Sequence, residues 1–253
     1  MRRLSLLAIV AVAGVLPFAV HAQGRAGGPP PTARASAPID LTGYWVAVVN
    51  EDWRYRMLMP AKGEYGGIPI TKEALQIMNS WDPAADEKAG EQCKSYGAAA
   101  IMRLPARLHI TWQDDSTLKV DVDAGTQTRL FRFGPGATGG PGGSKDEKTW
   151  QGDSTAQWER GGGRGGPPVG GSLTVVTKNM RAGYLRKNGV PYSENATVTD
   201  YFDLSPSPGG QILVVTTTVD DPRYLTQPLI LSSHFKKEAD GSKWDPTPCS
   251  SRW

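Results

Sequence analysis

The chain is poor in the residues that most often carry chemistry. It has two cysteines and three histidines in 253 residues, and one of these histidines, His21, lies in an apolar N-terminal stretch. So few histidines disfavour a His-rich metal site, and we expect neither a metal nor a cofactor. The patterns G-x-S-x-G and H-E-x-x-H and the calcium-loop pattern are also missing, so nothing local marks a nucleophile.

Clustered charge is missing as well. The sequence has 28 Lys and Arg against 25 Asp and Glu, a formal net charge of +3. The basic residues are scattered along the chain, which excludes the concentrated positive patch of a nucleic-acid-binding protein. Residues 134–139 match G-x-G-x-x-G, but more Gly and Pro follow instead of a helix. A dinucleotide site is therefore not expected.

The first 22 residues predict a secretory signal. Arg2 and Arg3 precede an apolar run from Leu4 to Val20, and Ala22 ends a stretch suited to signal peptidase. The alternative is an uncleaved anchor, for which the run is short. No later stretch is long and apolar enough to span a bilayer. We expect a periplasmic or secreted bacterial protein without an integral membrane segment after signal removal.

The two cysteines, Cys93 and Cys249, predict a disulfide, because an even number of cysteines in an oxidising compartment favours pairing. The loop-entropy relation gives a bridge of this span roughly 4–5 kcal/mol. A metal or redox pair is the alternative, but no C-x-x-C or nearby histidine favours it.

The distribution of Gly, Pro, Val, Thr and aromatic residues predicts one β-rich domain. A flexible Gly, Pro and Ala leader over 23–38 precedes a single domain over 39–253. Strands are expected at 41–49, 53–59, 106–113, 117–123, 126–133, 149–159, 172–180, 196–204, 211–220 and 229–237. One short helix begins after its cap Thr71 and ends at Asp82-Pro83.

This order predicts an all-β fold, an antiparallel meander barrel of about 8–10 strands with one short N-terminal helix. A sandwich is the alternative. The glycine-rich segments 134–146 and 160–171 predict long flexible loops. They are either tolerated insertions or a mobile lid.

The opening Leu41-Thr42-Gly43-Tyr44-Trp45, followed by a meander, resembles the lipocalin-like (calycin) barrels, whose first strand carries G-x-W. The resemblance implies a barrel that holds one small ligand. The stretches LTGYW, QTRLFRF and HFKKEADGSKWDPTPC also resemble a family of uncharacterised exported bacterial proteins, which implies no activity.

Strand parity decides where a site could lie. His109 shares a strand face with Thr111 and Gln113, while Leu108, Ile110 and Trp112 share the other. An inward polar face would bring together in the lumen His109, Asp121, Arg129, Asp200 and His234. An outward polar face would leave them solvated and give an apolar lumen. We predict that His109 lies on the lumen side or at its mouth.

These patterns leave several functions open. The first is an exported binding protein for a small apolar or amphipathic ligand in the barrel cavity, with ligand contacts from Trp112, Asp121, Arg129 and Tyr201. The second is an enzyme, a lyase, isomerase or hydrolase, with acid-base residues His109, Asp200 and His234 in the same cavity. The third is a structural, envelope-associated protein without a ligand.

Overall fold

Nine strands of the described chain close into a barrel. A computed structural model describes residues 30–134, 147–161 and 170–252. The predicted signal 1–22, residues 23–29 of the predicted leader and most of both glycine-rich segments lie outside the described residues. Residues 31–253 form one unit, and the description below concerns that unit.

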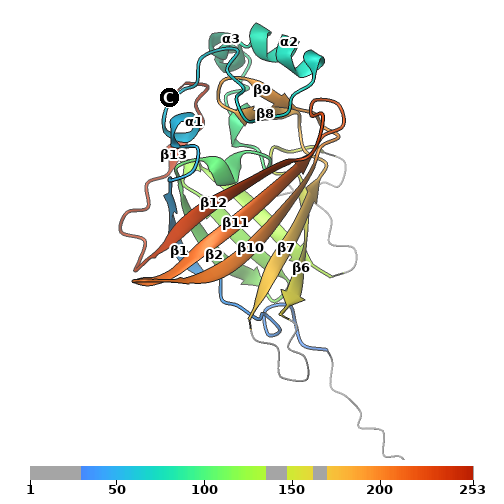
Figure 1. The fold of residues 1–253 in the computed structure, drawn as a ribbon. Coiled ribbons are helices and arrows are strands. Elements are labelled where there is room, and N and C mark those ends of the chain that lie inside the picture. The colour runs from blue at the N-terminus through green and yellow to red at the C-terminus, as the bar shows by residue number, and fades with distance from the viewer. Residues whose placement is uncertain (1–29, 135–146, 162–169, 253) are drawn as a thin grey trace, which may run out of the picture. The chain divides into compact units, whose positions relative to one another are not determined.

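The barrel strands coincide closely with the runs predicted from β-propensity. They are β1 (Gly43–Val48), β2 (Arg107–Asp114), β3 (Thr117–Val122), β5 (Gln127–Phe133), β6 (Asp153–Arg160), β7 (Gly171–Lys178), β10 (Thr197–Ser207), β11 (Gly210–Asp220) and β12 (Leu229–Glu238). The turn between β2 and β3 is built by Asp114, whose carboxylate accepts hydrogen bonds from the backbone and the hydroxyl of Ser116. The prediction that these strands form a β-barrel is confirmed (Figure 1).

The barrel is mixed, so the expectation of a purely antiparallel meander is wrong. Around the barrel the order is β1-β12-β11-β10-β7-β6-β5-β3-β2, which follows the chain, with β1 closing on β12. All neighbours are antiparallel except β5 and β6. The reason is topological. Each antiparallel pairing reverses direction, and a closed ring requires an even number of reversals, so a nine-strand ring needs a parallel pair.

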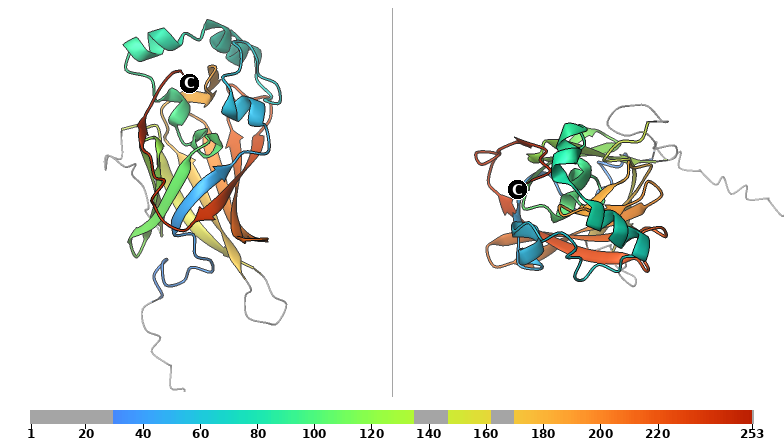
Figure 2. Two further views of the ribbon diagram at one scale, coloured as in Figure 1. Left: turned by 90° about the vertical axis from the view of Figure 1, so that its left-hand side faces the viewer. Right: turned by 90° about the horizontal axis from the view of Figure 1, so that it is seen from above.

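The helices gather at one end of the barrel together with a small hairpin (Figures 1 and 2). They are α1 (Trp53–Met57), α2 (Lys72–Ser80) and α3 (Pro83–Lys88), and the hairpin joins β8 (Gly183–Arg186) to β9 (Val190–Tyr192). The 3-10 turns η1 (Lys94–Tyr96) and η2 (Ile101–Arg103) lead from α3 towards β2.

Local sequence explains two of these helices. The expectation of one short N-terminal helix is wrong, since the described chain has three helices and all of them follow β1. The predicted helix is α2, and the Thr71 hydroxyl accepts from the Ala74 N–H as its cap. Asp82 and Pro83 follow α2 and also begin the next helix, because Asp82 caps α3 and Pro83 occupies its first turn. The strand expected over 53–59 is wrong, because its first five residues form α1.

The barrel interior is filled by side chains. On β2 the inward residues are Leu108 and Ile110, both fully buried, so the apolar face of this strand points inward. One apolar cluster fills most of the barrel and includes Trp45, Phe131, Phe202 and Phe235. A second cluster fills the covered end and includes Met78, Met180, Tyr192 and Val219.

The opposite end of the barrel is covered by residues 31–38, which belong to the predicted leader. The Trp158 indole N–H donates to the Ala33 carbonyl over 2.9 Å, and the Arg34 N–H donates to the Asp115 carbonyl over 3.1 Å. This part of the leader is docked on the barrel, contrary to the expectation of a flexible segment.

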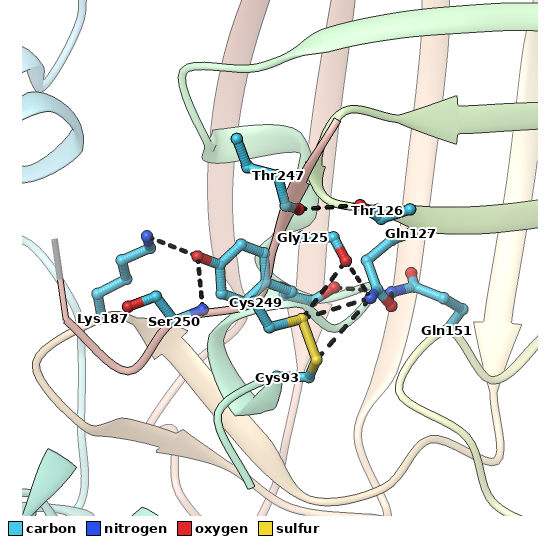
Figure 3. The surroundings of a disulfide bond; sticks show 10 residues. Cys93, Gly125, Thr126, Gln127, Gln151, Lys187, Thr247, Cys249 and Ser250 are labelled. Atoms are coloured by element: carbon cyan, nitrogen blue, oxygen red, sulfur yellow. Dashed lines mark hydrogen bonds between the residues drawn. A yellow bond between two sulfur atoms is a disulfide. The ribbon is translucent and has the colours of Figure 1, made fainter. Parts of the chain in front are cut away.

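The predicted disulfide is present. Cys93 and Cys249 are joined across a separation of 156 residues, with their Cα atoms 5.1 Å apart (Figure 3). The bridge holds the C-terminal segment, whose strand β13 (Thr247–Pro248) pairs in parallel with β4 (Ala124–Gly125). A disulfide fits a location outside the reducing cytoplasm. No helix in the described ranges is long and apolar enough to cross a membrane.

Candidate functional site

The structure places the first predicted site residue, His109, outside the lumen. Its neighbours Leu108 and Ile110 belong to the interior cluster, so His109 points away from it. Its ring stacks on the ring of Tyr44, with centroids 4.1 Å apart and planes inclined by 1°. The prediction that His109 faces the lumen is therefore wrong, because on β2 the apolar face is the buried one.

Two further predicted ligand contacts lie on the outside of the barrel. Asp121 forms an ion pair of 2.7 Å with Lys119, and both side chains are partly exposed. Tyr201 is 40% exposed. By contrast Trp112 is partly buried against the interior cluster, with its ring 5.7 Å from that of Phe133. The four predicted ligand contacts, with Arg129 as the fourth, are not brought together.

The lumen contains an ion pair between Arg129 and Asp200. Both side chains are 0% exposed, and Arg129 Nη1 lies 2.9 Å from Asp200 Oδ2. Neither atom has a well-directed hydrogen bond, so charge attraction holds this contact. Arg129 Nη2 donates to Thr177 Oγ1 over 3.1 Å, and Asp200 Oδ1 accepts from the Thr217 hydroxyl.

This pair is the polar layer between the two apolar clusters. On β10, Asp200 stands between Val198 of the second cluster and Phe202 of the first. The pair is sealed from solvent by these neighbours, so it is poorly placed to meet a substrate. His109 lies outside the barrel wall and Asp200 lies inside it. The three predicted acid-base residues therefore do not assemble.

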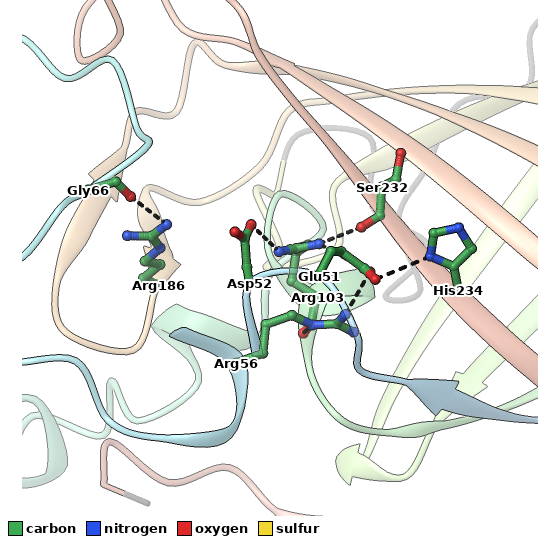
Figure 4. Close-up of polar contacts among 8 residues, drawn as sticks. All are labelled: Glu51, Asp52, Arg56, Gly66, Arg103, Arg186, Ser232 and His234. Atoms are coloured by element: carbon green, nitrogen blue, oxygen red, sulfur yellow. Dashed lines mark hydrogen bonds and ion pairs between the residues drawn. The ribbon is translucent and has the colours of Figure 1, made fainter. Parts of the chain in front are cut away.

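A group of four cations surrounds one cavity at the covered end. Arg56 comes from α1, Arg103 from η2, Arg186 from the end of β8, and Lys187 from the turn that follows β8. All four line one cavity of about 40 Å³, and Figure 4 shows the three arginines from their separate elements. We call this site the arginine pocket.

Acidic residues neutralise two of these cations. The Glu51 carboxylate accepts from Arg56 Nη1 over 2.8 Å, and its other oxygen lies 3.3 Å from Nδ1 of His234. Asp52 accepts from Arg103 Nη2 over 2.8 Å. His234 is thus the one predicted acid-base residue that joins the arginine pocket, through Glu51.

Backbone oxygens fix the same arginines in place. Arg56 Nε donates to the Arg103 carbonyl over 2.8 Å, and Arg103 Nη1 donates to the Ser232 carbonyl on β12. Each guanidinium is therefore anchored by a second element of the fold. The anchoring leaves little freedom for the cations to turn towards water.

Arg186 has uncharged partners. Its Nη2 donates to the Gly66 carbonyl over 2.9 Å, and its guanidinium carbon lies 4.1 Å from the centre of the Tyr55 ring. A backbone carbonyl and an aromatic face carry no formal charge. Asp52 and Glu64 act on the Arg186 guanidinium electrostatically, but their ion pairs are with Arg103 and Arg54.

Burial of these cations has an electrostatic cost. Burial and then the neighbouring Arg103 lower the pKa of Arg56 to about 10, and burial lowers the pKa of Arg103 and of Arg186. Moreover, Arg56 Nη2 and Arg186 Nη1 are buried without a hydrogen-bond partner. A buried donor without a partner costs about 1–3 kcal/mol, and more when charged. An anionic oxygen that reached either nitrogen would recover that free energy.

The remaining walls of the arginine pocket are mostly apolar. They include Ile68, Leu104, Leu185 and Leu231. A cavity needs roughly 10–15 Å³ to hold one water molecule. The arginine pocket therefore has room for a few oxygen atoms, the size of a carboxylate or phosphate group, and apolar walls around it.

The sequence held weak signals for this site. Arg56 lies in WRYRMLM, where bulky and basic residues alternate, and Arg103 is isolated within the apolar run AAAIMRLP. An arginine inside an apolar run indicates a buried cation that needs partners. The convergence of the three arginines could not be foreseen, because they come from separate elements.

Comparison of the chain with protein-family models, with curated proteins and with solved structures gives no match.

Proposed function

We propose that the protein is an exported binding protein for a small amphipathic molecule that carries an anionic group. The anionic group occupies the arginine pocket at the covered end of the barrel. The predicted ligand class is kept, while the place of binding moves from the lumen to this end.

One observation carries the proposal: Arg56 and Arg186 line the same cavity, and each has a buried N–H group without a hydrogen-bond partner. Charge-assisted hydrogen bonds from guanidinium to carboxylate or phosphate are among the strongest in proteins. The apolar walls suit the part of the ligand next to its charged group.

Two further features support this assignment. The Gly43-Tyr44-Trp45 opening and the closed barrel are in keeping with the lipocalin-like resemblance, which we retain as part of the proposal. The signal predicted over 1–22 and the disulfide support export to the periplasm or beyond. The enzyme alternative is not proposed, since its three acid-base candidates do not meet.

The test is titration calorimetry of the purified chain with octanoate and, as the matched neutral probe, octanol. We expect octanoate to bind and octanol to bind at least tenfold more weakly. Substitution Arg186→Met should weaken octanoate by about 10- to 100-fold, the equivalent of a charged hydrogen bond of about 1.5–3 kcal/mol. Arg186 is chosen because its hydrogen-bond partner is the Gly66 carbonyl, so no carboxylate is left without its cation.

The control variant is Arg54→Met. Arg54 belongs to the same helix as Arg56, but its side chain is 63% exposed and pairs with Glu64 on the surface. Octanoate affinity should not change in this variant. Equal affinity of wild type and Arg186→Met for octanoate would refute the arginine pocket as the binding site.

A further inference from the structure

A second hollow adjoins the arginine pocket beneath the C-terminal segment. Its volume is about 340 Å³, within the range of small-molecule sites. Much of its lining is apolar and comes from Leu104, Pro105, Ala124 and Pro248. We call it the C-terminal hollow.

The two cavities share walls. Leu104 and Lys187 line both of them. Lys187 Nζ donates to the Tyr96 hydroxyl oxygen over 2.9 Å, and the Ser250 N–H reaches the same oxygen over 3.2 Å (Figure 3). Lys187 is thus held where the cationic arginine pocket meets the C-terminal hollow.

The outer wall of the C-terminal hollow is fixed to the barrel. The Thr247 N–H donates to the Asp123 carbonyl over 3.0 Å, and its carbonyl accepts from the Thr126 hydroxyl over 2.9 Å. Two residues beyond Thr247, Cys249 is tied to Cys93 by the disulfide. Two hydrogen bonds and a covalent bond therefore hold this wall of the hollow.

We propose that the C-terminal hollow holds the apolar body of the ligand whose anionic group sits in the arginine pocket. The ligand class is then a single-chain amphiphile with one anionic head, such as a medium-chain carboxylic acid. This inference rests on the proposed function, because the head fixes one end of the ligand. The arginine pocket, at about 40 Å³, has no room for the chain, while the neighbouring 340 Å³ does.

The chain passes from one cavity to the other over Leu104, which belongs to both. Lys187 lies at the same boundary, next to the head. At the outer rim, Arg252 pairs with Glu87 over 3.3 Å. The far end of the ligand therefore meets a neutralised pair, which suits an uncharged tail.

The experiment is an NMR titration of the disulfide-bonded chain with butanoate, hexanoate and octanoate. Each buried methylene raises affinity by about fourfold. The affinity of wild type should rise steadily along the series. In Thr247→Trp, which places an indole in the C-terminal hollow from an exposed position, this rise should vanish, so that octanoate binds no more tightly than butanoate.

Ser250→Trp fills the same hollow from a second position, so the test does not depend on the folding of Thr247→Trp alone. Gln211→Trp, at an exposed position of β11, is the control and should keep the full rise.

The outcomes separate the two proposals. A rise that persists in both filled variants shows that the chain lies elsewhere and overturns this inference alone. The same conclusion follows if wild type binds the three acids equally. If butanoate does not bind wild type at all, the proposed function fails, and this inference fails with it.

Discussion

Breaking the lumen ion pair should destabilise the fold strongly. In Asp200→Leu, the fully buried Arg129 would keep its charge and lose the carboxylate 2.9 Å away. Removal of one partner from a buried pair costs about 3–5 kcal/mol, because the other charge stays buried without compensation. Asp200 also accepts the Thr217 hydroxyl, which adds to the loss.

The double variant Arg129→Met/Asp200→Leu should recover most of this loss. Both side chains lie beside apolar clusters, and apolar residues of similar volume replace a buried pair with little cost or a gain of about 1–4 kcal/mol. The two substitutions are therefore expected to be strongly coupled, since each single variant leaves a lone buried group.

The assay is urea unfolding of the oxidised protein, followed by tryptophan fluorescence, for wild type, both single variants and the double variant. Asp121→Asn is the matched control. It disrupts the 2.7 Å ion pair between Lys119 and Asp121, two residues of β3 whose side chains are 34% and 21% exposed, and such surface pairs contribute about 0–1 kcal/mol. The reasoning is refuted if Asp200→Leu costs no more than Asp121→Asn, or if the double variant is as unstable as the sum of the singles.

Three further outcomes are expected. Reduction of the Cys93–Cys249 bridge, which spans 156 residues, should lower the free energy of unfolding by up to about 5 kcal/mol in the loop-entropy relation. Urea unfolding with and without reductant measures this loss, and an unchanged unfolding midpoint would contradict the prediction. Asp221→Ala should lower the free energy of unfolding by about 3 kcal/mol or more, because this buried carboxylate accepts from the N–H and the hydroxyl of Ser193 over 2.6 and 2.8 Å. Urea unfolding measures the loss, and a value below about 1 kcal/mol would speak against this role. Burial raises the pKa of Asp123, so its ionisation opposes folding, and this carboxyl contributes stability at low pH that is lost as pH rises through its unfolded and then its folded pKa. Relative to Asp123→Asn, wild type should therefore be less stable at pH 6.5 than at pH 3, and the reverse order would exclude this role.

The prediction for His109 shows where reasoning from the sequence stops. Alternation on β2 correctly separated His109 from Leu108 and Ile110, but it does not say which face is buried. That choice depends on whether the neighbouring strands present apolar side chains to the same side. Here the interior is filled by apolar clusters, and His109 stacks on Tyr44 outside.

The arginine pocket illustrates the same limit from another side. Arg56, Arg103 and Arg186 stand in a helix, a 3-10 turn and a hairpin that are far apart in sequence. Their joint presence around one cavity arises only when these elements fold over the end of the barrel (Figure 4). Secondary-structure propensity and residue spacing do not predict such long-range contacts.

By itself the sequence determined the local and covalent features. β-Propensity set the barrel strands, the Thr71 hydroxyl set the start of α2, and parity of the cysteines set the pairing of Cys93 with Cys249. Tertiary structure alone decided the parallel pairing of β5 with β6, because ring closure of nine strands is a property of the whole barrel. It also decided which face of each strand is buried and which cations meet, since both depend on packing between distant segments.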